Sequence, residues 1–143
     1  MTAGLIHLAP THLTGPLAVL AVGGEIDLET APALRDEALV LIREGHTQLV
    51  LDLGEVFFCD SSGLNALIGI LRCAKAAGGS LTLAAVPDRV TRMLAVTGVA
   101  AVIASYPDAD AAMTALGLPP APAPASEPVP SPESAPEPSR EPI

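Results

Sequence analysis

The stretch VFFCDSSGL, from Val56 to Leu64, places two of the chain's three aromatic residues directly before a run of small polar residues. Aspartate and serine are preferred helix N-caps, because their side chains accept hydrogen bonds from amides that the first helical turn leaves unpaired. The stretch therefore predicts that a strand ends here and that a helix begins at Ser61. In α/β folds, binding sites gather at such strand ends.

The same stretch also has a purely structural explanation. Asp60 or Ser61 can act as a helix cap and nothing more, and Phe58 can pack as a hydrophobic staple against the first helical turn. Judged on residue type alone, capping is the commoner role. The stretch by itself therefore does not establish a functional site.

Short apolar runs alternate with amphipathic ones on both sides of this stretch. Apolar runs bounded by glycine or proline predict strands, and apolar residues spaced three and four apart predict helices. Thr30 is the expected cap of the first helix and Gly45 its stop. The expected strands are 5–13, 17–22, 49–53, 81–86 and 99–104, and further helices are expected over 61–77, 87–96 and 107–116.

The order β-β-α-β-α-β-α-β-α predicts an α/β fold, because helices that connect parallel strands cross over the sheet. We expect a small mixed, largely parallel sheet of four to five strands with flanking helices, begun by one hairpin. A polar turn, Gly23-Gly-Glu-Ile-Asp27, follows the second strand. If that strand lies next to 49–53, Asp27 and Ser61 share one edge of the sheet.

Composition and motifs exclude several classes of function. A net charge of −9 with few aromatics argues against a nucleic-acid partner. No apolar run approaches the roughly 18 residues of a membrane span, and the N-terminus lacks the basic region of a secretory signal. Cys59 and Cys73 lack metal-ligand spacing and the three histidines are scattered, so we expect a reduced, cytoplasmic chain without a metal or a membrane contact.

The serines also lack the surroundings of a catalytic nucleophile. Cys59 stands two residues before Ser61 and Asp60 two before Ser62, so neither lies in a G-x-S-x-G elbow. No histidine lies in the motif to act as a base, and no phosphate-binding glycine loop is present. The sequence therefore predicts a binding protein and not an enzyme.

Composition changes abruptly after Leu118. Residues 119–143 contain ten of the fifteen prolines and carry a net charge of −3. Such a segment cannot bury enough apolar surface to offset its ordering entropy. We expect a folded domain over 1–118 and a disordered Pro/Ala/Glu-rich tail over 119–143, which is either a solubilising tail or a proline-rich ligand.

The ordered set of motifs resembles the anti-sigma factor antagonist branch of the STAS domain family, over nearly all of residues 5–117. The resemblance implies a small mixed sheet flanked by helices. The matching pieces are Gly24-Glu-Ile-Asp27 with Thr30, Leu49-Val-Leu-Asp-Leu53, Asp60-Ser-Ser-Gly-Leu64, Gly78-Gly79 before a strand, and VTRMLAVTG from Val90 to Gly98.

The resemblance also implies a binding switch controlled by phosphorylation. In that family a cytoplasmic anti-sigma factor, itself a serine kinase, phosphorylates the first serine of the Asp-Ser-Ser-Gly motif, which is Ser61 here. The unmodified antagonist binds the anti-sigma factor and so frees a sigma factor for transcription. The phosphorylated form is released, and a serine phosphatase resets it. No cofactor is expected in this chain, because the partner would supply the nucleotide and Mg²⁺.

The resemblance and the place of the motif together predict a partner-binding surface near the start of the 61–77 helix. Asn65 departs from the family, which often has a small residue there. An alternative within the family is a STAS binding module that is not phosphorylated, acting as a scaffold or a transport-system subunit. The predicted surface comprises Asp27, Asp60, Ser61, Ser62, Gly63 and Asn65.

Removing the proline-rich segment is expected to leave the fold intact. A chain that ends at Leu118 should melt within about two degrees of the full-length chain, because exposed terminal segments contribute little stability. Differential scanning calorimetry of the two chains measures the difference. A drop of many degrees would show that residues 119–143 dock on the domain.

Overall fold

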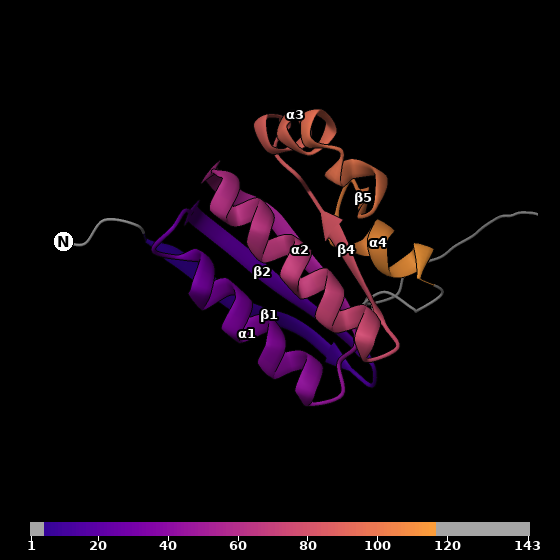
Figure 1. Cartoon of the computed structure of the whole chain (residues 1–143). Helices are drawn as coiled ribbons and strands as arrows, with labels where there is room; N and C mark the ends of the chain where they lie inside the picture. Colours follow the sequence, from indigo (N-terminus) through magenta and orange to yellow (C-terminus); the bar gives the residue numbers. More distant parts are fainter. Residues whose placement is uncertain (1–4, 117–143) are drawn as a thin grey trace, which may run out of the picture.

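Five strands form one sheet in the order β1-β2-β3-β4-β5 in the computed structural model, which describes residues 5–116 (Figure 1). β1 pairs antiparallel with β2 as a hairpin, and the remaining neighbours pair parallel. The expected mixed, largely parallel sheet is therefore confirmed. The strands are β1 (Ile6–Thr14), β2 (Leu17–Ile26), β3 (Gln48–Cys59), β4 (Ser80–Ala84) and β5 (Ala104–Tyr106).

Four α-helices connect and follow these strands in the expected order. α1 and α2 lie side by side across one face of the sheet, which we call the front face (Figure 1). α4 packs on the opposite, back face against β3 and β4. The helices are α1 (Ala31–Arg43), α2 (Ser61–Ala76), α3 (Asp88–Thr97) and α4 (Ala109–Ala115).

The core is aliphatic on both faces of the sheet. On the front face, α1 and α2 bury residues such as Leu34 and Leu67 against Leu20 and Leu51, which are all fully buried. A smaller cluster under α4 joins Met113 to residues of β2, β3 and β4. Neither phenylalanine belongs to either cluster. The aromatic stretch that precedes Ser61 therefore does not serve as core.

The last predicted strand is wrong in its position. Residues expected as a strand over 99–104 begin as a 3₁₀ helix, Val99–Ala101, and β5 starts only at Ala104. Val99 and Ile103, four residues apart, are both buried against the main core. A spacing of four suits a helical turn, so the apolar run follows the period of a helix and not that of a strand.

β3 is longer than predicted, since it runs to Cys59 and not to Leu53. Its pairing with β2 shifts register twice, and each shift adds one residue to β3. Such bulges break the alternation of buried and exposed positions by which a strand is recognised in a sequence. The proposed tail, 119–143, lies outside the described residues. Within residues 5–116, no helix has both the length and the apolar character needed to cross a bilayer.

Candidate functional site

The ends of β2 and β3 bring the two polar motifs together. Ile26 pairs with Cys59 across the strands, and the amide of Asp60 donates a 3.1 Å hydrogen bond to the carbonyl oxygen of Ile26. Asp27 and Asp60 each follow directly on these paired residues. The structure thus places Asp27 and the first turn of α2 at one edge of the sheet, as predicted from strand order.

Asp60 caps α2 with both its side chain and its backbone. Its Oδ1 accepts a 2.8 Å hydrogen bond from the amide of Ser62, and its carbonyl oxygen accepts from Gly63 and Leu64 at 3.0 and 3.3 Å. Across the described part of the chain, the amide of Ser61 is the one member of 61–64 without a partner. The structural role considered for Asp60 is therefore confirmed.

Ser61 occupies the first position of α2, and its side chain is exposed. Among residues 5–116, no hydrogen bond engages its hydroxyl, so that oxygen is open to a reagent from solution. Ser62 is half-buried, whereas Asn65, one turn further, is exposed on the same helix. Of the two serines, Ser61 is therefore the more exposed.

Gly63 lets α2 start in close contact with the strand ends. A Cβ atom at this position would collide with Cys59 Sγ and would lie 2.9 Å from Cγ2 of Ile26. Cβ atoms essentially never approach other atoms that closely. Gly63 is buried, so close packing explains why a glycine stands at this position of the motif. Gly63 was predicted to belong to the partner-binding surface, but it could contact a partner only through its backbone.

Asp27 and Thr30 together form a reciprocal cap before α1. Asp27 Oδ1 accepts from the amides of Glu29 and Thr30 at 2.9 and 3.0 Å. Thr30 Oγ1 accepts a 2.8 Å hydrogen bond from the amide of Asp27 and donates to the carbonyl oxygen of Glu25 at 2.7 Å. Thr30 occupies the predicted N-cap position of α1, but its side chain makes no capping hydrogen bond to the helix. Its hydroxyl bonds back along the chain instead, in a capping-box arrangement with Asp27.

The staple predicted for Phe58 is also wrong. The residue that directly precedes the Asp60 cap is Cys59, which is buried beside Gly63. Phe58 is 44% exposed and lines a hollow of about 420 Å³ together with Pro87 and Met93, on the α3 side. The aromatic side chain therefore faces the surface and not the first turn of α2.

Burial raises the pKa of the Cys59 thiol from its ordinary 9.0 to about 11, and the charge of Asp60 adds to this. Desolvation disfavours the thiolate, and so does a neighbouring carboxylate. Because the thiolate is the reactive form, Cys59 is a packing residue and not a nucleophile at neutral pH.

A shallow hollow of about 180 Å³ lies between the starts of α1 and α2, next to the serines. α1 contributes Leu28 just before the helix, with Pro32 and Arg35, and α2 contributes Ser62 and Asn65. The α1 side of this hollow was not predicted from the sequence. Leu28 is 77% exposed, an unusual position for a leucine, and it was visible in the sequence only as an apolar residue outside the helical stripe.

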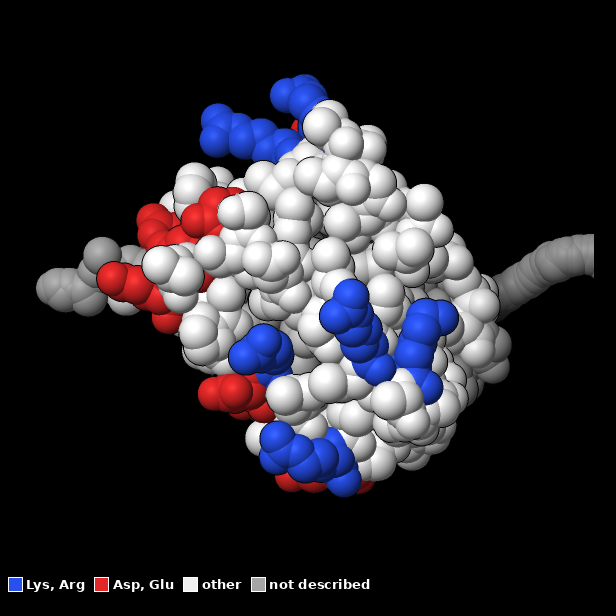
Figure 2. Space-filling view, in the orientation of Figure 1, with Lys and Arg blue, Asp and Glu red and all other residues white. Residues whose placement is uncertain are grey.

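Arg35 is the cation that this hollow brings to α2. Its Cδ and Nη1 atoms lie 3.5 and 3.9 Å from the position of a Cβ on Gly69. Gly69 follows Ser61 by eight residues, which is about 12 Å along the helix. In this conformation the guanidinium therefore lies away from Ser61. Figure 2 shows acidic side chains gathered over the end of the molecule where α1 and α2 begin.

His12 and His46 lie away from both serines. His46 hydrogen-bonds through Nδ1 to the carbonyl oxygen of Gly15 at 2.8 Å, and His12 through Nε2 to Thr14 Oγ1 at 3.0 Å. These contacts lie at the ends of β1 and β2 that are remote from Ser61. In the described part of the chain, no group of three or more His, Cys, Asp or Glu side chains is arranged to hold a metal ion.

Comparison with known proteins agrees with this geometry. The family model described as "Mlab, STAS domain" matches residues 11–104. The chain belongs to the STAS domain family. The anti-sigma-B factor antagonist of Bacillus subtilis (strain 168) is 35% identical over 82 residues, which are 57% of this chain and 74% of that protein.

Solved structures of anti-sigma factor antagonists share the fold. An anti-sigma factor antagonist from Mycobacterium paratuberculosis superposes with a TM-score of 0.71 at 30% identity, covering 79% of this chain and 95% of that one. The Bacillus cell fate determinant SpoIIAA in its phosphorylated form gives a TM-score of 0.61 at 19% identity, covering 76% of this chain and 99% of that one. The second likeness shows the fold alone.

Replacing Gly63 with alanine tests the close packing of α2. Gly63→Ala should lower the free energy of unfolding by about 1–3 kcal/mol, because an overpacked contact forces the helix start away from β2 and β3. The matched control is Gly69→Ala in the same helix, where a Cβ makes only ordinary contact with Arg35. That control should gain up to about 1 kcal/mol from helix propensity. Urea unfolding of both variants gives the comparison, and equal effects would contradict the packing argument.

The raised pKa of Cys59 is tested by alkylation. At about pH 8, iodoacetamide should label the half-buried Cys73 and leave Cys59 unmodified, because few Cys59 thiolates form and the sulfur is covered. Peptide mass spectrometry locates the label. In denaturant both cysteines should react, which is the control. Equal native labelling of the two would show that Cys59 is open.

Proposed function

We propose that this STAS protein is an anti-sigma factor antagonist whose binding is switched by phosphorylation of Ser61. Unmodified, it binds an anti-sigma factor that is a serine kinase, and a sigma factor is freed for transcription. Phosphorylated at Ser61, it is released, and a serine phosphatase restores it. The observation that carries the proposal is the exposed Ser61 hydroxyl on a rigid helix start within the Asp-Ser-Ser-Gly motif.

The surroundings of Ser61 favour its role as a kinase substrate. A kinase needs a hydroxyl that is exposed and held in a fixed place, and the Asp60 cap and the Gly63 contact hold this one. Neither serine has a histidine as a hydrogen-bond partner among residues 5–116, so the hydroxyl has no base to activate it as a nucleophile. This supports a binding switch and not catalysis by this chain.

The exposure of neighbouring side chains supports a partner surface around Ser61. Leu28 supplies an exposed apolar contact and Asn65 an exposed amide, with Ser61 beside them. Asp60 and Asp27 already use one carboxylate oxygen each in capping, so their contribution to a partner would be through the remaining oxygen and their charge. Interface cores favour such apolar anchors with few charges, and a ring of polar groups around them.

The structure supports a phosphate that acts at the interface and not inside the domain. Phosphorylation adds a charge of about −1.5 to −2. The start of α2 offers it one open amide, that of Ser61, and a nearby carboxylate that repels it. Arg35, the cation that lines the neighbouring hollow within residues 5–116, rests against Gly69 and is not positioned in this conformation to clamp the phosphate.

Burying that dianion in a packed interface costs a few kcal/mol in desolvation and repulsion. A cost of this size lowers the affinity for the partner by about a hundredfold or more. Ser61→Asp should therefore weaken binding of the anti-sigma factor strongly, whereas Ser61→Ala should retain it. The matched control is Ser105→Asp, which adds the same charge at an exposed serine in β5. Capture with the Ser61→Ala chain identifies the partner, and calorimetry with the purified partner gives the affinities.

The captured partner then serves as the kinase. With ATP it should label Ser61 and not Ser62, as read by fragment mass spectrometry. Amide spectra of the labelled chain should change only near 24–30 and 57–67. Labelling of Ser62, or equal affinity of both forms, would overturn the switch. If the partner binds the chain but never phosphorylates it, the result favours the alternative hypothesis. In that hypothesis the chain is an unphosphorylated STAS binding module in a scaffold or a transport system.

A further inference from the structure

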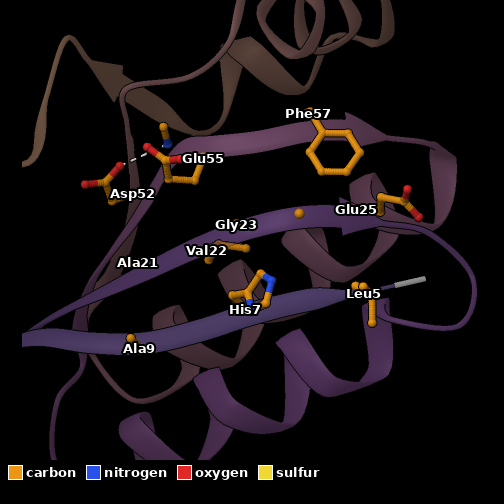
Figure 3. A pocket seen from close by; sticks show the side chains of 12 residues that line it. Leu5, His7, Ala9, Ala21, Val22, Gly23, Glu25, Asp52, Glu55 and Phe57 are labelled. Atoms are coloured by element: carbon orange, nitrogen blue, oxygen red, sulfur yellow. Dashed lines mark hydrogen bonds between the residues drawn. The ribbon is translucent and has the colours of Figure 1, made fainter. Parts of the chain in front are cut away.

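Part of the back face of the sheet has no helix over it within residues 5–116. α4 covers the half that carries Leu17, Val19 and Val50. Beyond it, β1, β2 and β3 enclose an open hollow of about 700 Å³ (Figure 3). This hollow lies on the face opposite α2.

Small residues and the two bulges of β3 form the hollow. Its floor holds alanines and glycines, and a Cβ at Gly23 would lie 2.9 Å from Cβ of Glu55. The register shifts on β3 fall next to Glu55 and Phe57, the two residues that stand at the β3 side of the hollow in Figure 3. Bulges re-aim side chains in this way near binding sites. The small residues are Ala9, Ala21, Gly23, Gly24 and Gly54.

Negative charge surrounds this apolar floor. Glu25, Asp52 and Glu55 line the hollow, and no lysine or arginine does. Asp52 Oδ1 accepts from the amide of Gly54 at 3.0 Å, which leaves its second oxygen available. Among the lining residues, His7 is the sole group that can carry a positive charge. The unbalanced potential favours an occupant that brings cations.

Both phenylalanines of the chain lie at this hollow or beside it. Phe57 is 66% exposed and lines the hollow, and it also borders the second hollow that Phe58 lines. Burying a phenylalanine in the core would stabilise the fold by about 1.5–3 kcal/mol, yet the core uses none. Exposed aromatic side chains at a concave surface are typical binding anchors, and an aromatic face also attracts a cation.

We propose that this hollow, lined by β1, β2 and β3, is a second interaction surface that binds a cationic, apolar segment of a partner protein. A lysine or arginine of the segment lies between Phe57 and the carboxylates, and an aliphatic side chain enters the hollow. The chain's own residues 119–143 do not match, because they carry a net charge of −3. Two copies of the acidic hollow facing each other would repel. The proposal does not depend on the switch at Ser61.

Peptide titration of the ¹⁵N-labelled full chain tests this surface. The probe is a capped hexapeptide that alternates lysine and leucine, and its counterpart alternates glutamate and leucine. The lysine peptide should shift the amides of Ala21, Gly23, Glu55 and Phe57, more weakly at high salt, and the glutamate peptide should not. The double variant Phe57→Ala, Glu55→Gln should weaken binding at least tenfold.

Matched variants separate the possible outcomes. Val96→Ala with Glu44→Gln removes an exposed valine and an exposed carboxylate elsewhere, and Ser61→Asp alters the switch; both should leave the titration unchanged. Absent shifts, equal binding of the two peptides, or shifts confined to 61–66 would overturn the proposal. So would a dimer, seen by sedimentation, that Phe57→Ala dissociates, because a second copy would then occupy the hollow.

Discussion

The first turn of α2 rests on the ends of β2 and β3 so closely that residue 63 has no room for a side chain. One backbone hydrogen bond, from Asp60 to Ile26, joins the end of one strand to the cap that follows the other. The glycine then lets the helix approach Cys59 and Ile26. Because these contacts involve backbone and buried atoms, the position of Ser61 is fixed without using its own hydroxyl, which is left exposed.

The acidic residues of this edge also serve the fold, because their carboxylates cap backbone amides. The carboxylates of Asp60 and Asp27 both accept hydrogen bonds from backbone amides. In return, the hydroxyl of Thr30 accepts a hydrogen bond from the amide of Asp27. A substitution at any of these positions would change the fold of the edge together with its surface. If a substitution of Asp27 or Asp60 alters partner binding, the stability of the variant must therefore be measured as well. Ser61, Asn65 and Leu28 are exposed and can be changed with little effect on packing.

The sequence predicted the order of the elements and the meeting of the two motifs, because glycine stops, helical periodicity and strand order are local signals. It failed where tertiary packing decides. The bulges of β3 hide the strand beyond Leu53, and the run after Gly98 packs with the period of a helix. Thr30 and Asp27 both suit a cap, so residue type could not tell that Asp27 is the one that accepts from the amides of Glu29 and Thr30. Arg35 and Leu28 lie next to α2 only because α1 and α2 pack side by side, and the sequence of one segment alone does not predict that packing.

Within residues 5–116 the core contains no fully buried aromatic residue, which has an optical consequence as well. The chain has no tryptophan, and its single tyrosine, Tyr106, packs on the back-face cluster beneath α4. Ultraviolet emission from this protein therefore reports how α4 sits on β3 and β4. Ser61 starts α2 on the other face of the sheet, and the chain has no tryptophan or second tyrosine that could report on that face, so a signal from Ser61 requires an added dye or an isotope label.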